Sequence, residues 1–218
     1  MSDPAGTHTS DEYRIENCDV DSLRGKTILV SSAGNVPQYG VSLRLLSRAG
    51  DESDTAFVVT TTESADETAR CYESVRNGSS APELRLVDTT SEQQYISSPY
   101  GEIPTVFTPS PSDYERLTLA LSDLSNSSPP RDGARHFAVR SLSPLLATDN
   151  VPQVRDALQR VTGVASDRGL CLLGVRQNVL DPETLSTIST IADGMLWVSP
   201  RSEGRLELEY FDSTDRYF

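Results

Sequence analysis

The chain has 218 residues, enough to bury a substantial core within one domain. It carries 19 Lys and Arg against 32 Asp and Glu, and the net charge of −13 disfavours nucleic-acid and anionic-membrane partners. No apolar run approaches the roughly 20 residues of a membrane helix, and the sequence shows no export signal. The three Cys lie outside any C-x-x-C spacing, so the sequence predicts a cytoplasmic protein.

Along the chain, predicted strands alternate with predicted helices. Residues 1–25 are polar and acidic and are expected to be largely disordered, which leaves residues 26–218 as a single domain. Six short runs are continuously apolar, as is typical of strands that are covered on both faces. These runs are Thr27–Ser32, Thr55–Thr60, Glu83–Val87, Arg135–Val139, Leu170–Val175 and Gly194–Ser199.

Five segments between or after these strands have helical patterns. They are Tyr39–Ala49, Ala65–Val75, Ser112–Leu124, Val151–Val164 and Asp181–Ala192. Gly50 is expected to cap the carboxyl end of the first helix. Ser64 and Glu67 have the spacing of a capping box at the start of the second.

The alternation predicts a three-layer α/β fold with a mostly parallel central sheet. The sequence "RLELEYF", residues 205–211, alternates in polarity and predicts an antiparallel edge strand or a hairpin with residues 194–199. Residues 89–110 are polar and interrupt the rhythm. Within them, "IPTVF" at 103–107 is either a short extra strand or part of a binding loop.

The first strand leads into the turn and helix "SSAGNVPQYGVSLRLL". A strand, a small-residue turn and a helix form a common phosphate site, in which backbone N–H groups and a Lys hold the phosphates. No Lys follows Gly40. Lys26, the only Lys of the chain, precedes the strand and is therefore expected at its opposite end.

Four segments, in this order, carry a resemblance to a known family. They are "ILVSSAGNVPQYGVSLRLL", "VVTTTESADETARCYESV", "HFAVRSLSPLL" and "DRGLCLLGVRQNVLDPETLSTISTIADGMLWV". Together they resemble the RecA-like P-loop ATPases, specifically their archaeal KaiC-like branch, from about residue 25 to 212. The resemblance implies a RecA-like fold, ATP as the ancestral ligand, and side-by-side assembly with itself or with an active relative.

Position by position, the resemblance implies that most of the family's phosphate chemistry is missing. If Gly40 is the second glycine of the P-loop, Val41 stands where the Lys belongs and Ser42 takes the magnesium position. The first glycine position falls on Asn35, with Gly34 one place early.

Arg140 stands where the family has the Asp that holds magnesium and its water. Glu63 occupies the position of the Glu that polarises the attacking water, although an acidic residue also suits a helix start. Two further alternatives exist for Arg140: it binds an anion without metal, or it pairs with Glu63, which we favour. No catalytic residue is assigned beyond the candidate Glu63, and no metal site is predicted.

Gly34, Asn35, Gly40, Ser42 and Arg140 are the candidate ligand-binding residues. We therefore expect a non-catalytic pseudo-ATPase that acts as a regulatory or scaffolding protein through protein–protein contacts, with no required cofactor. The alternative is a protein that still binds ATP through a remodelled P-loop, with weak or no hydrolysis.

The basic residues also bear on the source of the protein, because 18 of the 19 are Arg. Many carboxylates with almost no Lys resemble the proteins of salt-loving archaea, where multimolar salt screens carboxylate repulsion beyond roughly 3 Å. The composition therefore favours a halophilic archaeal protein over an ordinary acidic one.

Overall fold

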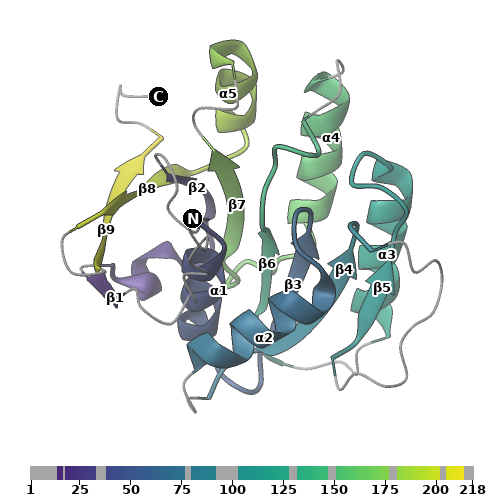
Figure 1. The fold of residues 1–218 in the computed structure, drawn as a ribbon, viewed down its shortest axis with the longest axis horizontal. Helices are drawn as coiled ribbons and strands as arrows, with labels where there is room; N and C mark the ends of the chain where they lie inside the picture. Colours follow the sequence, from purple (N-terminus) through teal and green to yellow (C-terminus); the bar gives the residue numbers. More distant parts are fainter. Residues whose placement is uncertain are drawn as a thin grey trace, which may run out of the picture.

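The computed structural model describes residues 14–16, 18–32, 38–76, 80–91, 103–127, 132–146, 151–176, 181–201 and 205–213. Within them the chain forms one nine-stranded sheet between two layers of helices (Figure 1). The strands lie in the order β1-β9-β8-β2-β7-β6-β3-β4-β5, and every pair is parallel except β8 with β9. The predicted three-layer fold with a mostly parallel sheet is confirmed.

The sheet spans the chain from residue 14 to residue 212. Its strands are β1 (Arg14–Glu16), β2 (Thr27–Ser32), β3 (Thr55–Thr60), β4 (Glu83–Asp88), β5 (Thr105–Phe107), β6 (Arg135–Val139), β7 (Cys171–Arg176), β8 (Gly194–Pro200) and β9 (Arg205–Asp212). The central strands are buried along nearly their whole length, which explains why their apolar runs are continuous rather than alternating.

Helices cover both faces of the sheet (Figure 1). On one face, α1 (Gln38–Ala49) and α2 (Ala65–Arg76) pack with the 3-10 helix η2 (Val20–Leu23) over the residues centred on Ile28 and Val58. On the other, α3 (Tyr114–Asn126), α4 (Val151–Thr162) and α5 (Pro182–Ser189) pack over Leu29 and Phe57. Neighbouring residues of one strand therefore pack into the cores on opposite faces of the sheet, because successive side chains of a strand point to opposite faces.

The structure differs from the prediction at the amino-terminal side of the domain. The segment 1–25, expected to be largely disordered, contains β1 and η2, and β1 pairs with β9 in the same sheet. β9 does form the predicted hairpin with β8, but it is not an edge strand because β1 lies outside it. A three-residue strand and one 3-10 turn are too short to produce a readable apolar period.

Gly50 shows a position where tight packing, rather than turn geometry, selects the residue. Gly50 directly follows α1, which ends at Ala49 as expected. The described glycine with positive φ is Gly25, at 74°, so Gly50 does not have the left-handed conformation of a glycine helix cap. A Cβ at Gly50 would lie 2.2 Å from a carboxylate oxygen of Asp54 and 2.7 Å from Nε2 of His136. Gly50 is therefore required by the close approach of these two side chains.

The strand order locates the crevice in which such sheets bind ligands. From β2 the chain passes to β3 on one side, whereas the connection from β7 to β8 places β8 on the other side of β2. The order reverses at β2, and open α/β sheets bind ligands beyond the carboxyl ends of the strands at such a reversal. The candidate site is accordingly the carboxyl edge of β2, β3 and β6.

Candidate functional site

Arg140 is the central charged residue of this edge. It follows β6 directly, and its side chain is buried, with a relative exposure of 3%. Its guanidinium donates a hydrogen bond through Nη1 to the hydroxyl of Thr68 in α2, and its Nη2 lies 3.6 Å from Oε2 of Glu63. The ion pair between Arg140 and Glu63 that we favoured from the sequence is therefore present.

The position of Arg140 depends on contacts between β3, β6 and β7. The Thr61 hydroxyl donates to the carbonyl of Ser141 at 2.7 Å, and the Ser141 N–H donates back to that hydroxyl at 3.2 Å. On the other side, the N–H of Leu142 donates to the carbonyl of Gly174 at 2.8 Å. The chain leaving β6 is thus held on both sides, which fixes where the guanidinium begins.

Glu63 is the counter-ion of this buried cation. Its side chain is 25% exposed, and its Oε2 also accepts a hydrogen bond from the Thr62 hydroxyl at 2.6 Å. Glu63 does not cap α2, because Ser64 and Glu67 form the predicted capping box: the N–H of Ser64 donates to Glu67 at 3.0 Å and the N–H of Glu67 to Ser64 at 3.3 Å. One oxygen of Glu63 thus faces both Arg140 and Thr62.

The other candidate residues lie at the start of α1 or outside the described residues. Gly34 and Asn35 belong to the segment 33–37, which the structure does not describe, so the shape of the turn stays a prediction. Gly40 and Ser42 lie in the first turns of α1, and Ser42 is fully buried. Val41 is 2% exposed and belongs to the apolar core beneath α1.

Two buried serines near this end of β2 have hydroxyl groups without a hydrogen-bond partner in the part of the chain that the structure describes. They are Ser32, the last residue of β2, and Ser42. Buried hydroxyls are usually paired, so such atoms call for an explanation.

Lys26 lies at the opposite edge, as the sequence predicts. It directly precedes β2, and its ammonium donates a hydrogen bond to the hydroxyl of Tyr210 at 3.2 Å, 4.7 Å from the centre of that ring. Lys26 therefore contacts β9 and lies at the end of β2 opposite to the candidate site.

Asp88 is a site residue that sequence reasoning missed. It ends β4 and is fully buried, and its carboxylate accepts hydrogen bonds from the backbone N–H of Ala65 at 2.8 Å and of Thr90 at 2.8 Å. Burial alone would raise the pKa of Asp88, but its hydrogen bonds with Ser91, Ala65 and Thr90 together outweigh burial and hold that pKa below its usual value. The available signal was an acidic residue directly after the predicted strand "ELRLV".

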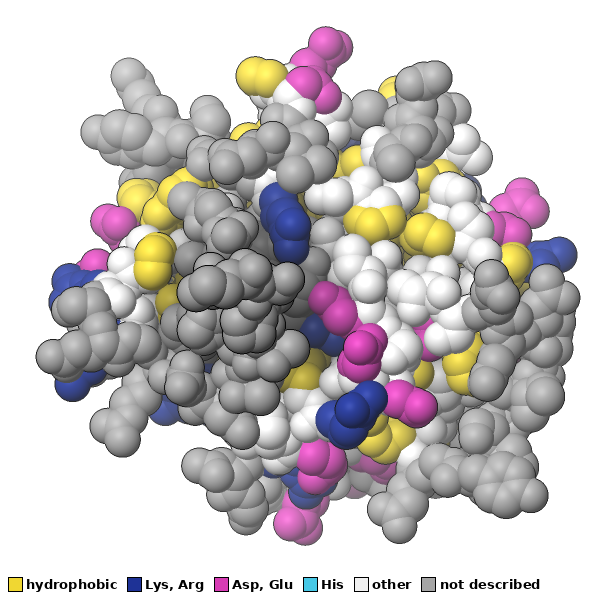
Figure 2. Space-filling view, in the orientation of Figure 1, with side chains coloured by type: hydrophobic (Ala, Val, Ile, Leu, Met, Phe, Trp, Pro, Cys, Tyr) yellow, Lys and Arg dark blue, Asp and Glu magenta, His cyan; other side chains and the backbone are white. Residues whose placement is uncertain are grey.

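Acidic and basic side chains adjoin near the middle of the face shown in Figure 2.

Among the described residues, no group of three or more His, Cys, Asp or Glu is arranged to hold a metal ion. No described helix is long and apolar enough to cross a membrane.

Gly174 provides a test of how strictly Arg140 is placed. A Cβ on Gly174 would lie 2.1 Å from the carbonyl oxygen of Arg140, a distance that backbone atoms cannot accept. Gly174→Ala is expected to lower the free energy of unfolding by about 1–3 kcal/mol. Urea denaturation in molar KCl measures it, with the exposed Gly163→Ala as control, since its nearest such contact is 3.2 Å. Equal losses in both variants would contradict the prediction.

Comparisons with known proteins place the chain in a family. Residues 25–197 match DUF7504, a family of unknown function, and no curated protein matches the chain. A solved structure from Pyrococcus horikoshii OT3, described only as a structural study, is similar with 12% identity and a TM-score of 0.51, over 86% of this chain and 88% of that one. That similarity shows the fold alone. Because the family match covers most of its length, this chain belongs to DUF7504, a family of unknown function.

Proposed function

We propose that this protein is a non-catalytic KaiC/RecA-like pseudo-ATPase, from a halophilic archaeon, that acts as a regulatory or scaffolding protein. The observation that carries the proposal is the buried Arg140, which contacts Thr68 and Glu63 where the family it resembles holds magnesium. The strand order, with its reversal at β2, and the sequence resemblance of the four segments support the RecA-like part of the proposal.

The residues present do not fit a magnesium–ATP complex. A guanidinium at the metal position repels a divalent cation, and the carboxylate of Glu63 already faces that guanidinium at 3.6 Å. Val41 offers no charge to the phosphates, and at 2% exposure it packs into the apolar core. Phosphoryl transfer depends on a cation at the phosphates and on a held metal, so we assign no catalytic step.

Protein partners fit the surface better than nucleic acid does. The net charge of −13 opposes a phosphate backbone. On β8 and β9, Met195 and Phe211 are paired across the strands, and Trp197 follows on the same face; all three are only partly buried. Partly exposed aromatic side chains of this kind are enriched at protein–protein interfaces.

A second candidate function is nucleotide binding without hydrolysis through a remodelled P-loop. The observation that favours it is the pair of buried hydroxyls, on Ser32 and Ser42, that lack hydrogen-bond partners among the described residues. Both lie where β2 gives way to α1, and a phosphate oxygen would accept hydrogen bonds from such hydroxyls.

Equilibrium binding of a fluorescent ATP analogue separates these functions. The measurement is made by anisotropy in molar KCl, with and without Mg²⁺, so that loss of folding in dilute buffer is not scored as loss of binding. We expect no saturable binding at high micromolar nucleotide, because the Lys and Asp positions hold Val41 and Arg140.

Ser42→Ala is the matched variant for the second candidate. It removes a hydroxyl that has no partner among the described residues, so the fold is expected to tolerate the change. Saturable binding that persists without Mg²⁺ and weakens about tenfold in this variant would support a remodelled P-loop. Binding that requires Mg²⁺ would contradict both the pseudo-ATPase proposal and the assignment of Arg140.

A further inference from the structure

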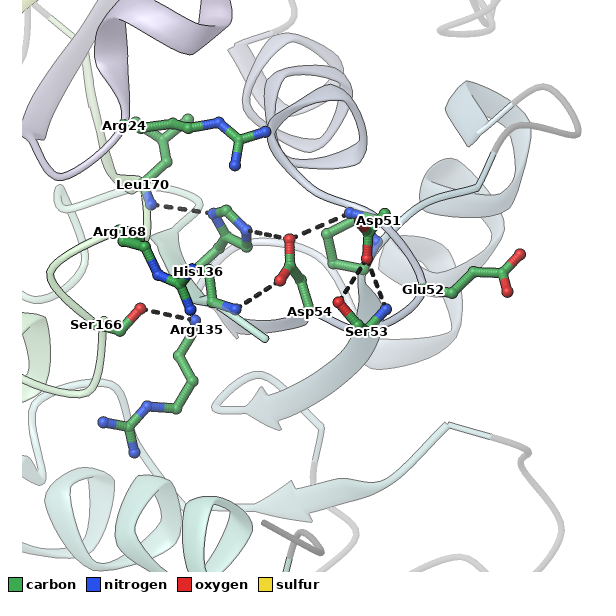
Figure 3. Close-up of polar contacts among 12 residues, drawn as sticks. Arg24, Asp51, Glu52, Ser53, Asp54, Arg135, His136, Ser166, Arg168 and Leu170 are labelled. Carbon is green, nitrogen blue, oxygen red and sulfur yellow. Dashed lines mark hydrogen bonds and ion pairs between the residues drawn. The ribbon is translucent and has the colours of Figure 1, made fainter. Parts of the chain in front are cut away.

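A buried Asp–His pair lies at the amino-terminal edge of the sheet, away from the candidate site (Figure 3). His136 is the second residue of β6 and is fully buried. Asp54 directly precedes β3 and is nearly as inaccessible. Neither residue contributes to the proposed function, and a buried titratable pair in a fold of this size needs its own explanation.

The hydrogen bonds of the pair define the protonation state of His136. Its Nδ1 accepts a hydrogen bond from the backbone N–H of Leu170 at 3.0 Å, so this nitrogen carries no proton. Its Nε2 lies 3.4 Å from Oδ2 of Asp54 and is therefore the protonated nitrogen of a neutral ring. Asp54 in turn accepts from the N–H of Ala134 at 2.5 Å and of Asp51 at 3.2 Å.

The neighbourhood leaves the ring no second arrangement. The Gly50 backbone is so close that a single added methyl would reach within 2.7 Å of Nε2 and 2.2 Å of Asp54. A ring turned by 180° would present carbon atoms to Leu170 and Asp54, so turning offers the Leu170 N–H no other acceptor. The bond between His136 and Leu170 therefore exists only while the ring is neutral.

Leu170 belongs to a turn, residues 166–170, that joins three parts of the fold. The N–H of Ser166 donates to the carbonyl of Arg135 at 3.0 Å, at the start of β6. The N–H of Gly25, just before β2, donates to the carbonyl of Gly169 at 2.8 Å. The carbonyl of Leu170 accepts from the N–H of Phe137 at 2.9 Å. The turn thus ties the entry of β2 to β6 and β7.

We propose that the protonation state of His136 controls whether the turn at 166–170 stays attached to β6. Protonation of Nδ1 replaces the acceptor of the Leu170 N–H with a second donor, and the turn at 166–170 then separates from β6. The response is a local opening at the amino-terminal edge of the sheet, which frees the segment that enters β2 from its bond to Gly169.

Burial of the ring sets the direction of the response. Burial lowers the pKa of His136 and outweighs Asp54, whose carboxylate raises it, while Arg24 lowers it further. Because the folded pKa lies below the unfolded value of about 6.5, the neutral ring's contribution to stability is complete above that pH. The contribution is lost as the pH falls through the folded pKa. Asp51 contacts the pair through its backbone N–H, and Figure 3 also shows Glu52 and Arg135, whose charged groups extend away from the ring, and Arg168.

Nuclear magnetic resonance of the full chain in molar KCl tests whether protonation of His136 releases the Leu170 amide. The chain has two His, so His8→Asn assigns the signals of His136. We expect the pKa of His136 to lie below its ordinary value of about 6.5 and its neutral ring to carry the proton on Nε2. As His136 titrates, protection of the Leu170 amide against hydrogen exchange, corrected for intrinsic rates, is expected to fall by roughly tenfold or more.

His136→Asn is the decisive variant, because its amide oxygen can replace Nδ1 as the acceptor and does not titrate. In it, protection of Leu170 should be independent of pH, whereas His8→Asn should leave the wild-type response unchanged. If His136→Asn does not fold, the wild-type titration still decides. A His136 pKa at or above 6.5, or Leu170 protection that is unaffected when His136 becomes charged, would overturn the proposal.

Discussion

Arg140→Ala is expected to lower the free energy of unfolding by about 3 kcal/mol, one of the two largest losses we expect from a single substitution in this chain. The guanidinium is buried, and it is held by the hydroxyl of Thr68 and faced by Glu63. Removing it leaves a cavity in a closely packed region and deprives a buried hydroxyl of its bond. Because Glu63 is 25% exposed, water can solvate the remaining carboxylate, which keeps the loss near the lower end for a broken buried pair.

A double-mutant cycle isolates the ion pair from the packing. Urea denaturation of Arg140→Ala, Glu63→Gln and the double variant is expected to give a coupling energy of about 1–3 kcal/mol, as for residues in direct contact. The control is Glu67→Gln, on the same turn, which keeps the capping box because Gln also accepts at that position.

The cycle separates an ion pair from a general effect of negative charge. Arg140 is the weakest of the influences that lower the pKa of Glu67, after the hydrogen bonds with Ser64. Because Glu67 is exposed, its coupling to Arg140 should stay below about 0.5 kcal/mol. If Arg140 couples no more strongly to Glu63 than to Glu67, the pair at 3.6 Å contributes nothing specific. The proposal that it occupies a former metal position would then lose its main support.

The sheet was predictable from sequence because its central strands are buried on both faces. Thr27–Ser32, Thr55–Thr60 and Arg135–Val139 have the predicted bounds, since a continuous apolar run is a local signal. β5, at Thr105–Phe107, corresponds to the first of the two alternatives left open for 103–107, a short extra strand rather than part of a binding loop. β1 was missed, because its three residues owe their strand structure to pairing with β9, which lies about 190 residues away.

The site was predictable only in part, for a similar reason. The resemblance located Glu63 and Arg140 at the same edge, and opposite charges in one crevice predict an ion pair. Thr68 was missed because it lies within α2, where sequence gives no sign that a residue 72 positions later reaches it. Gly50 was misread as a helix cap, because its constraint comes from the side chains of Asp54 and His136 rather than from its own backbone.

Asp88→Asn is expected to lower the free energy of unfolding by about 2–4 kcal/mol at neutral pH, although the substitution hardly changes the side-chain volume. Both carboxylate oxygens of Asp88 act only as acceptors, and the donors come from β3, the start of α2 and the turn after β4. The donors are the Thr60 hydroxyl at 3.3 Å, the Ala65 N–H at 2.8 Å, the Thr90 N–H and hydroxyl at 2.8 and 2.9 Å, and the Ser91 N–H and hydroxyl at 3.1 and 2.7 Å. An amide replaces one acceptor with an NH₂ group that faces donors.

The loss should depend on pH in a way that a packing defect does not. Because the folded pKa of Asp88 is held below its usual value, its contribution to stability is complete above the unfolded pKa of about 3.9 and is lost as the pH falls through the folded pKa. The difference in the free energy of unfolding between wild type and Asp88→Asn, measured by urea denaturation in molar KCl, should therefore be constant near neutral pH. It should become smaller below pH 4.

Asp66→Asn is the matched control, because it makes the same chemical change at an exposed position in the first turn of α2. It should cost about 0.3–1 kcal/mol through the helix dipole. A pH-independent gap for Asp88→Asn would mean that the carboxylate charge is not what its donors stabilise. A loss no larger than that of Asp66→Asn would mean that the bond from Ala65 does not hold α2 against β4. Asp88 accepts from the N–H of Ala65, and Glu63 lies only two residues before Ala65, so Asp88 is expected to help position Glu63. Either result would contradict that role.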